Sequence, residues 1–108
     1  MINYISSNEV MDYDVLFGRG KESAQHVGNI SFRALIESKF EDYLAGDVRG
    51  VARARLFVEI SDSVVQAGGR FLKKAGSRWV EVDMTTARCK VAQHFRDGVK
   101  LRLSLIHI

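Results

Sequence analysis

The spacing of hydrophobic residues changes from helical to strand-like at RFLKKAGSRWVEV, residues 70–82. Two β-prone runs, residues 70–74 and 78–82, flank a short loop that contains Gly76, and this arrangement is typical of a β-hairpin. Trp79 lies in the second run, and its large side chain is expected in the core because it stabilises most when buried. The stretch therefore predicts two antiparallel strands that contribute to the core.

Helical spacing of apolar residues dominates on both sides of this hairpin. It predicts amphipathic helices at residues 30–45 and 51–66 before the hairpin, and at residues 84–97 after it. Asn29 is expected to be the N-cap of the first helix, since its side chain can accept a hydrogen bond from a free backbone N–H. Gly68 follows the second helix, where a glycine readily adopts the left-handed conformation.

The remaining segments complete one domain. Residues 14–18 are a short apolar run that ends in a glycine turn, and we expect a brief buried strand there. Residues 21–28 are expected to be a loop, and residues 1–13 a flexible N-terminal arm. The order is strand, helix, helix, strand, strand, helix. We expect an α+β domain over residues 14–102, with the helices packed on a small antiparallel sheet.

The last six residues, LSLIHI at 103–108, resemble the in-frame translation of a sequencing-library transposase adapter. This resemblance predicts that the natural chain was cut near Arg102 and that the tail is not native. His107 is therefore left out of the functional candidates. The alternative is a genuine apolar end of a helix or strand.

Length and composition limit the class of protein. The 108 residues are 46% hydrophobic and 27% charged, which is typical of one globular domain and excludes a disordered, collagen-like or disulfide-stabilised chain. The single cysteine, Cys89, cannot form an internal disulfide and suits a reducing, intracellular compartment. No stretch approaches the roughly 20 apolar residues that span a bilayer, so we expect no membrane association.

Catalytic and metal-binding patterns are incomplete in this sequence. The turn at residues 18–21 lacks the further glycines of a phosphate-binding loop. Cys89 and His94 are five residues apart on the expected helix and point in different directions, and His26 has no partner at metal-ligand spacing. We therefore expect no enzyme, no metal and no cofactor. A small enzyme that uses the 18–21 turn with His26 is a further alternative, and it requires a pocket with a carboxylate nearby.

The net charge of +3 is divided unevenly along the chain. Residues 1–69 carry 7 basic and 10 acidic side chains, whereas residues 70–108 carry 9 basic and 3 acidic ones. A basic segment attracts polyanions, because each neutralised phosphate releases counterions. We expect a nucleic-acid-binding module of a nuclear regulatory protein, in which the hairpin, the last helix and the glycine turn contact phosphates. The expected contact residues are Arg19, Lys21, Arg70, Lys73, Lys74, Arg78, Arg88, Lys90 and Arg96.

Two other interpretations of these charges stay open. The cations can belong to an ordinary solvated surface, on which acids from the first half of the chain neutralise them. Alternatively, the domain is a non-enzymatic protein-interaction module that binds an acidic protein partner or dimerises through the helix at residues 30–45. A nucleic-acid interface requires the cations on one continuous face, whereas an interaction module predicts dispersed charge and an exposed apolar patch.

Several separated motifs follow one another in a specific order. They are DVLFGRG at 14–20, HVGN at 26–29 running into Phe32 and Arg33, GGRFLK at 68–73, WVEV at 79–82, and Ala87-Arg88 with Lys90-Val91. Together they resemble the domain of unknown function 6824 family, abundant in diatoms and related stramenopiles, over about residues 12–98. The family pattern usually reads His-Pro-Gly-Asn, so Val27 is a departure. The resemblance implies a eukaryotic origin and no assigned activity, and its motif residues contain no set of acid, base and nucleophile.

Overall fold

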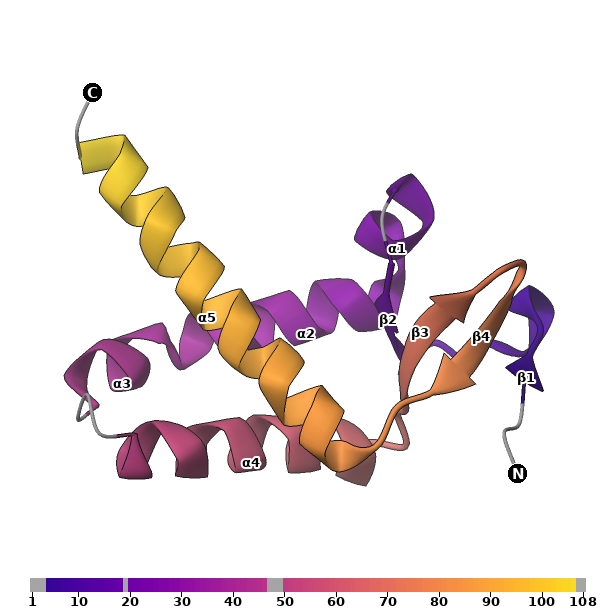
Figure 1. Ribbon diagram of the computed structural model, residues 1–108, viewed down its shortest axis with the longest axis horizontal. Coiled ribbons are helices and arrows are strands. Elements are labelled where there is room, and N and C mark those ends of the chain that lie inside the picture. Colours follow the sequence, from indigo (N-terminus) through magenta and orange to yellow (C-terminus); the bar gives the residue numbers. More distant parts are fainter. Residues whose placement is uncertain (1–3, 19, 47–49, 107–108) are drawn as a thin grey trace.

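The computed structural model describes residues 4–18, 20–46 and 50–106 (Figure 1). Within these ranges the chain forms five α-helices, one short 3-10 helix and a four-stranded sheet, which confirms the α+β class. The elements in chain order are β1 (Tyr4–Ile5), the short 3-10 helix η1 (Ser7–Glu9), β2 (Val15–Phe17), α1 (Lys21–Gln25), α2 (Val27–Ser38), α3 (Phe40–Ala45), α4 (Val51–Gln66), β3 (Phe71–Ala75), β4 (Arg78–Glu81) and α5 (Met84–Ile106).

The sheet has the strand order β1-β4-β3-β2. β3 and β4 form the predicted antiparallel hairpin, in which Leu72 lies opposite Glu81, and β1 adds to β4 in antiparallel orientation. β2 runs parallel to β3, so the sheet is mixed, whereas the sequence led us to expect antiparallel strands. The physical reason is the connection between β2 and β3, because helices α1 to α4 carry the chain back to the end of the sheet where β2 began.

The two faces of the sheet are covered differently. Cross-strand partners share a face, and side chains alternate along each strand. Val15 and Phe71 are partners in the register and belong to the main core, on what we call the helix-side face. Leu16 and Leu72 point the other way, into a second core on what we call the Trp79 face. The hairpin extends beyond the helices, so they cover only part of the helix-side face (Figure 1).

The main core joins the helices to one another. α5 crosses both α2 and α4, and the apolar residues predicted from helical spacing are buried along each of them (Figure 1). The bounds of α4 agree with the predicted helix at 51–66, and Gly68 directly after it has a φ of +93°. The buried residues of this core are Val15, Phe32, Ile36, Phe40, Tyr43, Leu56, Ile60, Val64, Phe71, Ala87, Val91 and Phe95.

The region around α1 and α2 differs from the sequence prediction. Residues 21–28 are not a loop, because α1 and the first turn of α2 occupy them, and Lys39 separates α2 from α3. Asn29 is not an N-cap but lies inside α2 and is buried. Its side-chain amide accepts a hydrogen bond from the Leu16 N–H at 2.7 Å and donates one to the Leu16 carbonyl oxygen at 2.8 Å. The amide therefore attaches α2 to β2, a contact that local sequence does not encode.

Both ends of the chain also differ from the expected boundaries. Residues 4–13, part of the predicted flexible arm, contribute β1 and η1 and cover the Trp79 face through Ile5 and Val10. The pairing of β1 with β4 satisfies backbone groups that a free arm would leave to water. At the other end α5 continues past residue 97 to Ile106 and so enters the segment that resembles an adapter.

Candidate nucleic-acid interface

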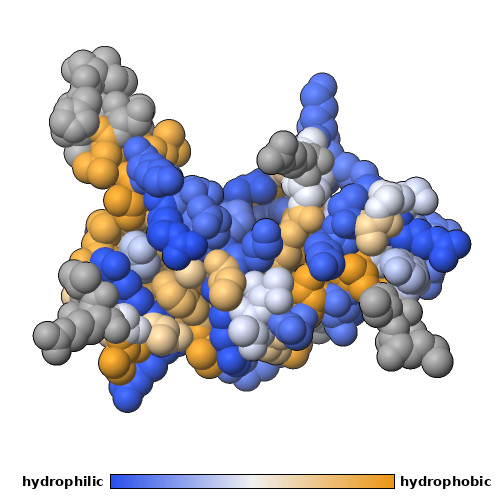
Figure 2. Space-filling view, viewed as in Figure 1, coloured by the Kyte–Doolittle hydropathy of each residue, from blue (hydrophilic) through white to orange (hydrophobic). Residues whose placement is uncertain are grey.

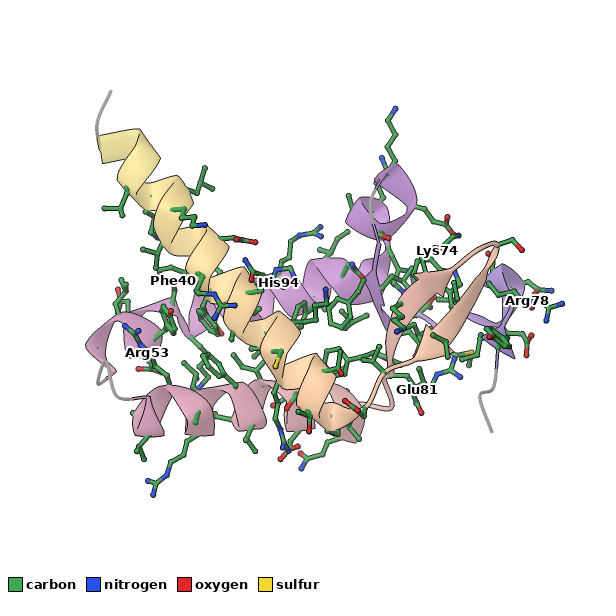
Figure 3. The ribbon with its side chains drawn as sticks, viewed as in Figure 1. Phe40, Arg53, Lys74, Arg78, Glu81 and His94 are labelled. Atoms are coloured by element: carbon green, nitrogen blue, oxygen red, sulfur yellow. The ribbon has the colours of Figure 1, made fainter. Side chains whose placement is uncertain are left out.

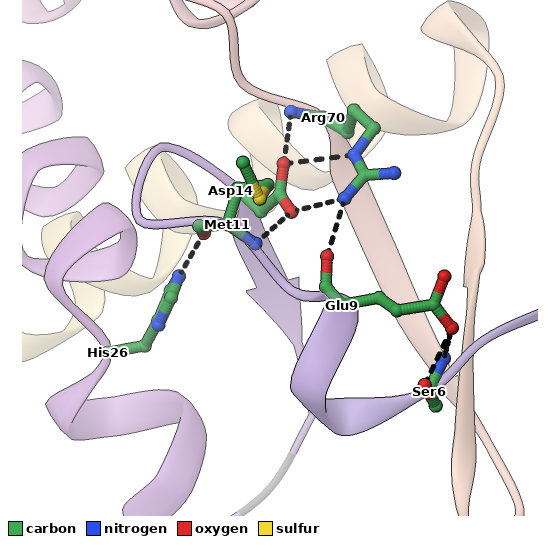
Figure 4. A network of polar contacts seen from close by, with 6 residues as sticks. All are labelled: Ser6, Glu9, Met11, Asp14, His26 and Arg70. Carbon is green, nitrogen blue, oxygen red and sulfur yellow. Dashed lines mark hydrogen bonds and ion pairs between the residues drawn. The ribbon is translucent and has the colours of Figure 1, made fainter.

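Arg70 makes the most extensive contacts of the eight predicted contact residues that the structure describes. Its Nε and Nη2 donate to the two carboxylate oxygens of Asp14 at 3.1 and 2.7 Å, and its backbone N–H donates to Oδ1 at 3.0 Å (Figure 4). Nη2 also donates to the carbonyl oxygen of Glu9 at 3.3 Å. The guanidinium of Arg70 is therefore bound by other groups of the same chain.

The charges of this pair stabilise each other. Burial alone would raise the pKa of Asp14, but hydrogen bonds from Arg70 and from the Met11 N–H outweigh it, so the pKa lies below its usual value. The hydrogen bond to Asp14 raises the pKa of Arg70 in turn. Because Asp14 is fully buried, removal of its partner would leave a desolvated charge. The role that these contacts give to Arg70 is structural.

Two more of the predicted contact residues, Arg88 and Lys74, do not join a common surface. Arg88 Nη2 lies 4.0 Å from a carboxylate oxygen of Asp62 on α4. Lys74 lies on the Trp79 face, where its Nζ is 4.7 Å from the centroid of the Trp79 ring (Figure 3). Arg19 lies outside the described residues.

Lys73 and Lys90 each lie beside Phe17. Lys73 is the register partner of Phe17, so both side chains lie on the helix-side face. Lys90 extends from α5, and its Nζ lies 5.9 Å from the centroid of the Phe17 ring. Arg78 shares this face with Lys73, because it lies two residues from Val80, the partner of Lys73 on β4. It projects from the hairpin at the end of the molecule opposite α3 (Figure 3).

A cleft adjoins Phe17 between the end of β2, α1, α2 and α5. Its volume is about 520 Å³. Arg33 from α2 and Lys90 from α5 both line it, and Lys21 begins α1 directly after Gly20, which also lines it. The lining residues are Leu16, Phe17, Gly18, Gly20, Ser23, Ala24, Asn29, Arg33, Lys90, Gln93, His94 and Asp97.

We call five cations around this cleft and the adjoining sheet face the basic surface: Lys21, Arg33, Lys73, Arg78 and Lys90. Among the residues that the structure describes, none of the five takes part in an ion pair. In Figure 2 hydrophilic residues predominate on α1 and at the outer end of the hairpin, whereas hydrophobic ones lie at the base of the hairpin and along the C-terminal part of α5. Arg96 is close to this surface, since it donates a hydrogen bond to Gln93, a cleft residue, at 2.9 Å.

Polar groups inside the cleft differ in how they are partnered. Gln93 donates to Asp97 at 2.8 Å, and Arg33 donates to the carbonyl oxygen of Ala24 at 2.7 Å. His94 packs edge-on against Phe32, and burial lowers its pKa, so the ring is neutral near neutral pH (Figure 3). Asp97 is the acid of the cleft and offsets part of its positive charge.

The glycine turn forms one wall of this cleft. Gly20 has a φ of +106° and precedes α1. Gly18 has no such angle but is close-packed, because a Cβ there would lie 3.1 Å from Ser23 Oγ and 3.2 Å from the Trp79 ring. His26, the partner of this turn in the enzyme alternative, is not among the cleft residues, and its Nε2 lies 3.1 Å from the carbonyl oxygen of Met11 (Figure 4).

A second groove of about 430 Å³ lies over the uncovered part of the sheet, beside the start of α5. Tyr4, Lys73 and Val80 line it, together with the acids Glu81 and Asp83. The Asp83 carboxylate accepts a hydrogen bond from the Thr86 N–H at 2.7 Å and so caps α5. The two acids make this groove less attractive to phosphate than the cleft.

Sequence reasoning missed Arg33 and the aromatic contribution of Phe17. Arg33 follows Asn29 by four residues, so both lie on one side of α2 and both line the cleft. The spacing of four residues could have placed Arg33 on the same side of α2 as Asn29. Only the hydrogen bond between Asn29 and Leu16 shows that this side of α2 faces β2. Across residues 4–18, 20–46 and 50–106 no three His, Cys, Asp or Glu side chains group as metal ligands, and no helix is long and apolar enough to cross a membrane.

The fold is thus a small α+β domain with a basic cleft at the end of β2. Comparison with family models matches residues 14–97 to DUF6824, a domain of unknown function, and the chain belongs to this family. The resemblance seen in the sequence motifs is confirmed. No curated protein and no solved structure matches the chain.

Proposed function

We propose that this domain binds nucleic acid through the basic surface. The observation that carries the proposal is the position of Lys73 and Lys90 about Phe17. Lys73 lies beside it on the sheet, and Lys90 Nζ is 5.9 Å from its ring centroid. Cations that flank an aromatic ring suit a polyanion whose bases carry π-faces.

Phosphate contact needs cations that the protein has not already neutralised. Lys21, Arg33, Lys73 and Arg78 are exposed, as is Lys90, whereas Arg70 and Arg88 have acidic partners. Each lysine or arginine that neutralises a phosphate releases counterions, so binding weakens as salt rises. With this function we propose an intracellular, nuclear location.

Lys73 and Lys74 lie on opposite faces of β3, so they provide a matched test of nucleic-acid binding. Lys73→Gln should weaken binding of a fluorescently labelled oligonucleotide by about fivefold and reduce the salt slope by about one, measured by anisotropy between about 50 and 200 mM salt. Lys74→Gln removes the same charge on the Trp79 face and should leave affinity within about twofold. Equal effects of the two changes, or no salt-dependent binding by the unmodified protein, would refute the proposal.

A competition experiment separates the acidic-protein alternative. Poly-L-glutamate offers carboxylates without bases, so it should displace the oligonucleotide poorly at equal charge concentration if bases contribute to affinity. Displacement as efficient as that by unlabelled oligonucleotide would favour an acidic protein partner instead.

A further inference from the structure

We infer that the nucleic acid is single-stranded and that the cleft beside Phe17 holds one of its unpaired bases. This inference rests on the proposed function and adds the class of nucleic acid. It follows from the shape of the cleft, its apolar wall and the polar and cationic side chains that line it.

The cleft has the form of a base pocket. At about 520 Å³ it exceeds what one base requires, and Phe17, Gly18 and Ala24 supply an apolar and aromatic wall. Bases in a duplex are stacked on their neighbours and present only their edges in the grooves. A base in a single strand can turn outward and stack on an aromatic side chain.

Ser23 adds a hydroxyl to the wall of the cleft. Its side chain is 4% exposed and lines the cleft. A hydroxyl can donate to or accept from the edge of any base.

Other cleft residues suit the edge of the base and its phosphates. Gln93 and the neutral ring of His94 each offer a donor and an acceptor. Arg33 and Lys90 come from different helices, so they can contact the phosphates on the two sides of the inserted nucleotide. A groove that combines cations with a stacking wall is what single-strand binding requires.

The first measurement compares single-stranded and duplex DNA of about 12 nucleotides at the same salt concentration, by fluorescence anisotropy. The unmodified protein should bind the single strand at least tenfold more tightly, which is within the range that stacking of one base supplies. Equal or tighter binding of the duplex would overturn the inference but leave the proposed function standing.

The second measurement fills the cleft without a change in charge. Ala24 is exposed on α1 and lines the cleft, so Ala24→Leu should lower single-strand affinity about tenfold and leave duplex affinity unchanged. Ala54→Leu makes the same change on the exposed side of α4 and should alter neither affinity. If Ala24→Leu fails to fold, Ser23→Ala replaces it, and a loss of about threefold for the single strand alone is expected.

The outcomes distinguish the two proposals. A single-strand preference that persists in Ala24→Leu and in Ser23→Ala would refute the base-binding cleft, while a loss in Lys73→Gln would still support the basic surface. No salt-dependent binding of either DNA by the unmodified protein would refute both.

Discussion

Asp14 and Arg70 lie 56 positions apart in the sequence and form a two-pronged ion pair at the start of the parallel strands. Next to it, the Val15 N–H donates to the carbonyl oxygen of Arg70 at 2.8 Å. The pair thus holds β2 in register with β3. It also occupies the guanidinium of Arg70, which the sequence predicts to contact phosphate because Arg70 belongs to the basic hairpin.

Arg70→Ala should destabilise the domain by about 3 kcal/mol, because it leaves the Asp14 carboxylate buried without its counter-charge. Chemical denaturation followed by circular dichroism measures the change. The control is Arg78→Ala on the same hairpin, which is exposed and should cost less than about 0.5 kcal/mol. Similar stability of the two variants would contradict a structural role for Arg70.

Acid should remove the contribution of Asp14. The pKa of Asp14 is below its ordinary value of 3.8, so the stability that its ionised form contributes is complete above that value and is lost as the pH falls through the lowered pKa. The stability difference between the unmodified protein and Asp14→Asn should therefore be constant above about pH 5 and shrink below about pH 4. Urea denaturation at a series of pH values tests this, and a difference independent of pH would contradict it.

Asn29→Ala should cost about 2 to 4 kcal/mol, since it leaves the buried N–H and carbonyl of Leu16 without partners. Asn29→Asp keeps an acceptor for the Leu16 N–H but places an oxygen against the carbonyl, so it should not restore stability. Thermal denaturation compares the variants with the exposed Ser31→Ala on the same helix. A change below about 1 kcal/mol for Asn29→Ala would argue against the attachment of α2 to β2.

Gly28→Ala should prevent or severely weaken folding, for steric reasons and not because of its backbone angles. A Cβ at this position would overlap the carbonyl oxygen of Asp14 and lie 2.7 Å from that of Asp12. Gly76→Ala is the informative comparison, because its φ of +64° is strained for alanine but no atom lies within 4 Å. It should cost about 1 kcal/mol. Equal losses in soluble yield and melting temperature would show that close packing at Gly28 is not limiting.

Stability should fall as the pH is lowered past 6.5 because of His94. Burial lowers the pKa of His94 below its ordinary value of 6.5, so the unfolded chain takes up the proton first as pH falls. The loss grows from about pH 7 until the pH reaches the lowered pKa and is then constant. His94→Gln should remove this slope between about pH 7 and pH 5 in urea denaturation. A slope that persists in His94→Gln would assign it to another group.

The hairpin at residues 70–82 and the buried faces of α4 and α5 were predictable because their signals are local. Alternation over a few residues and recurrence every three or four residues depend on the backbone of one segment. The structure confirms the hairpin and these helices. α1 was missed because its five residues carry too few apolar side chains to define a helical face.

The candidate site depended on contacts between segments that local patterns cannot relate. Lys73 and Lys74 are adjacent lysines that add the same charge to the basic segment, yet the sheet places their side chains on opposite faces. Arg33 belongs to the acidic half of the chain, and α2 brings it to the same cleft as Lys90 from α5.

The amino-acid sequence by itself determined the α+β class, the hairpin, the principal helices and the membership of the family, because each follows from spacing within short segments. The tertiary structure alone decided the parallel direction of β2, the pairing of Arg70 with Asp14 and the cations that remain available beside Phe17. These depend on which distant residues come into contact, and that is set by how the complete core packs.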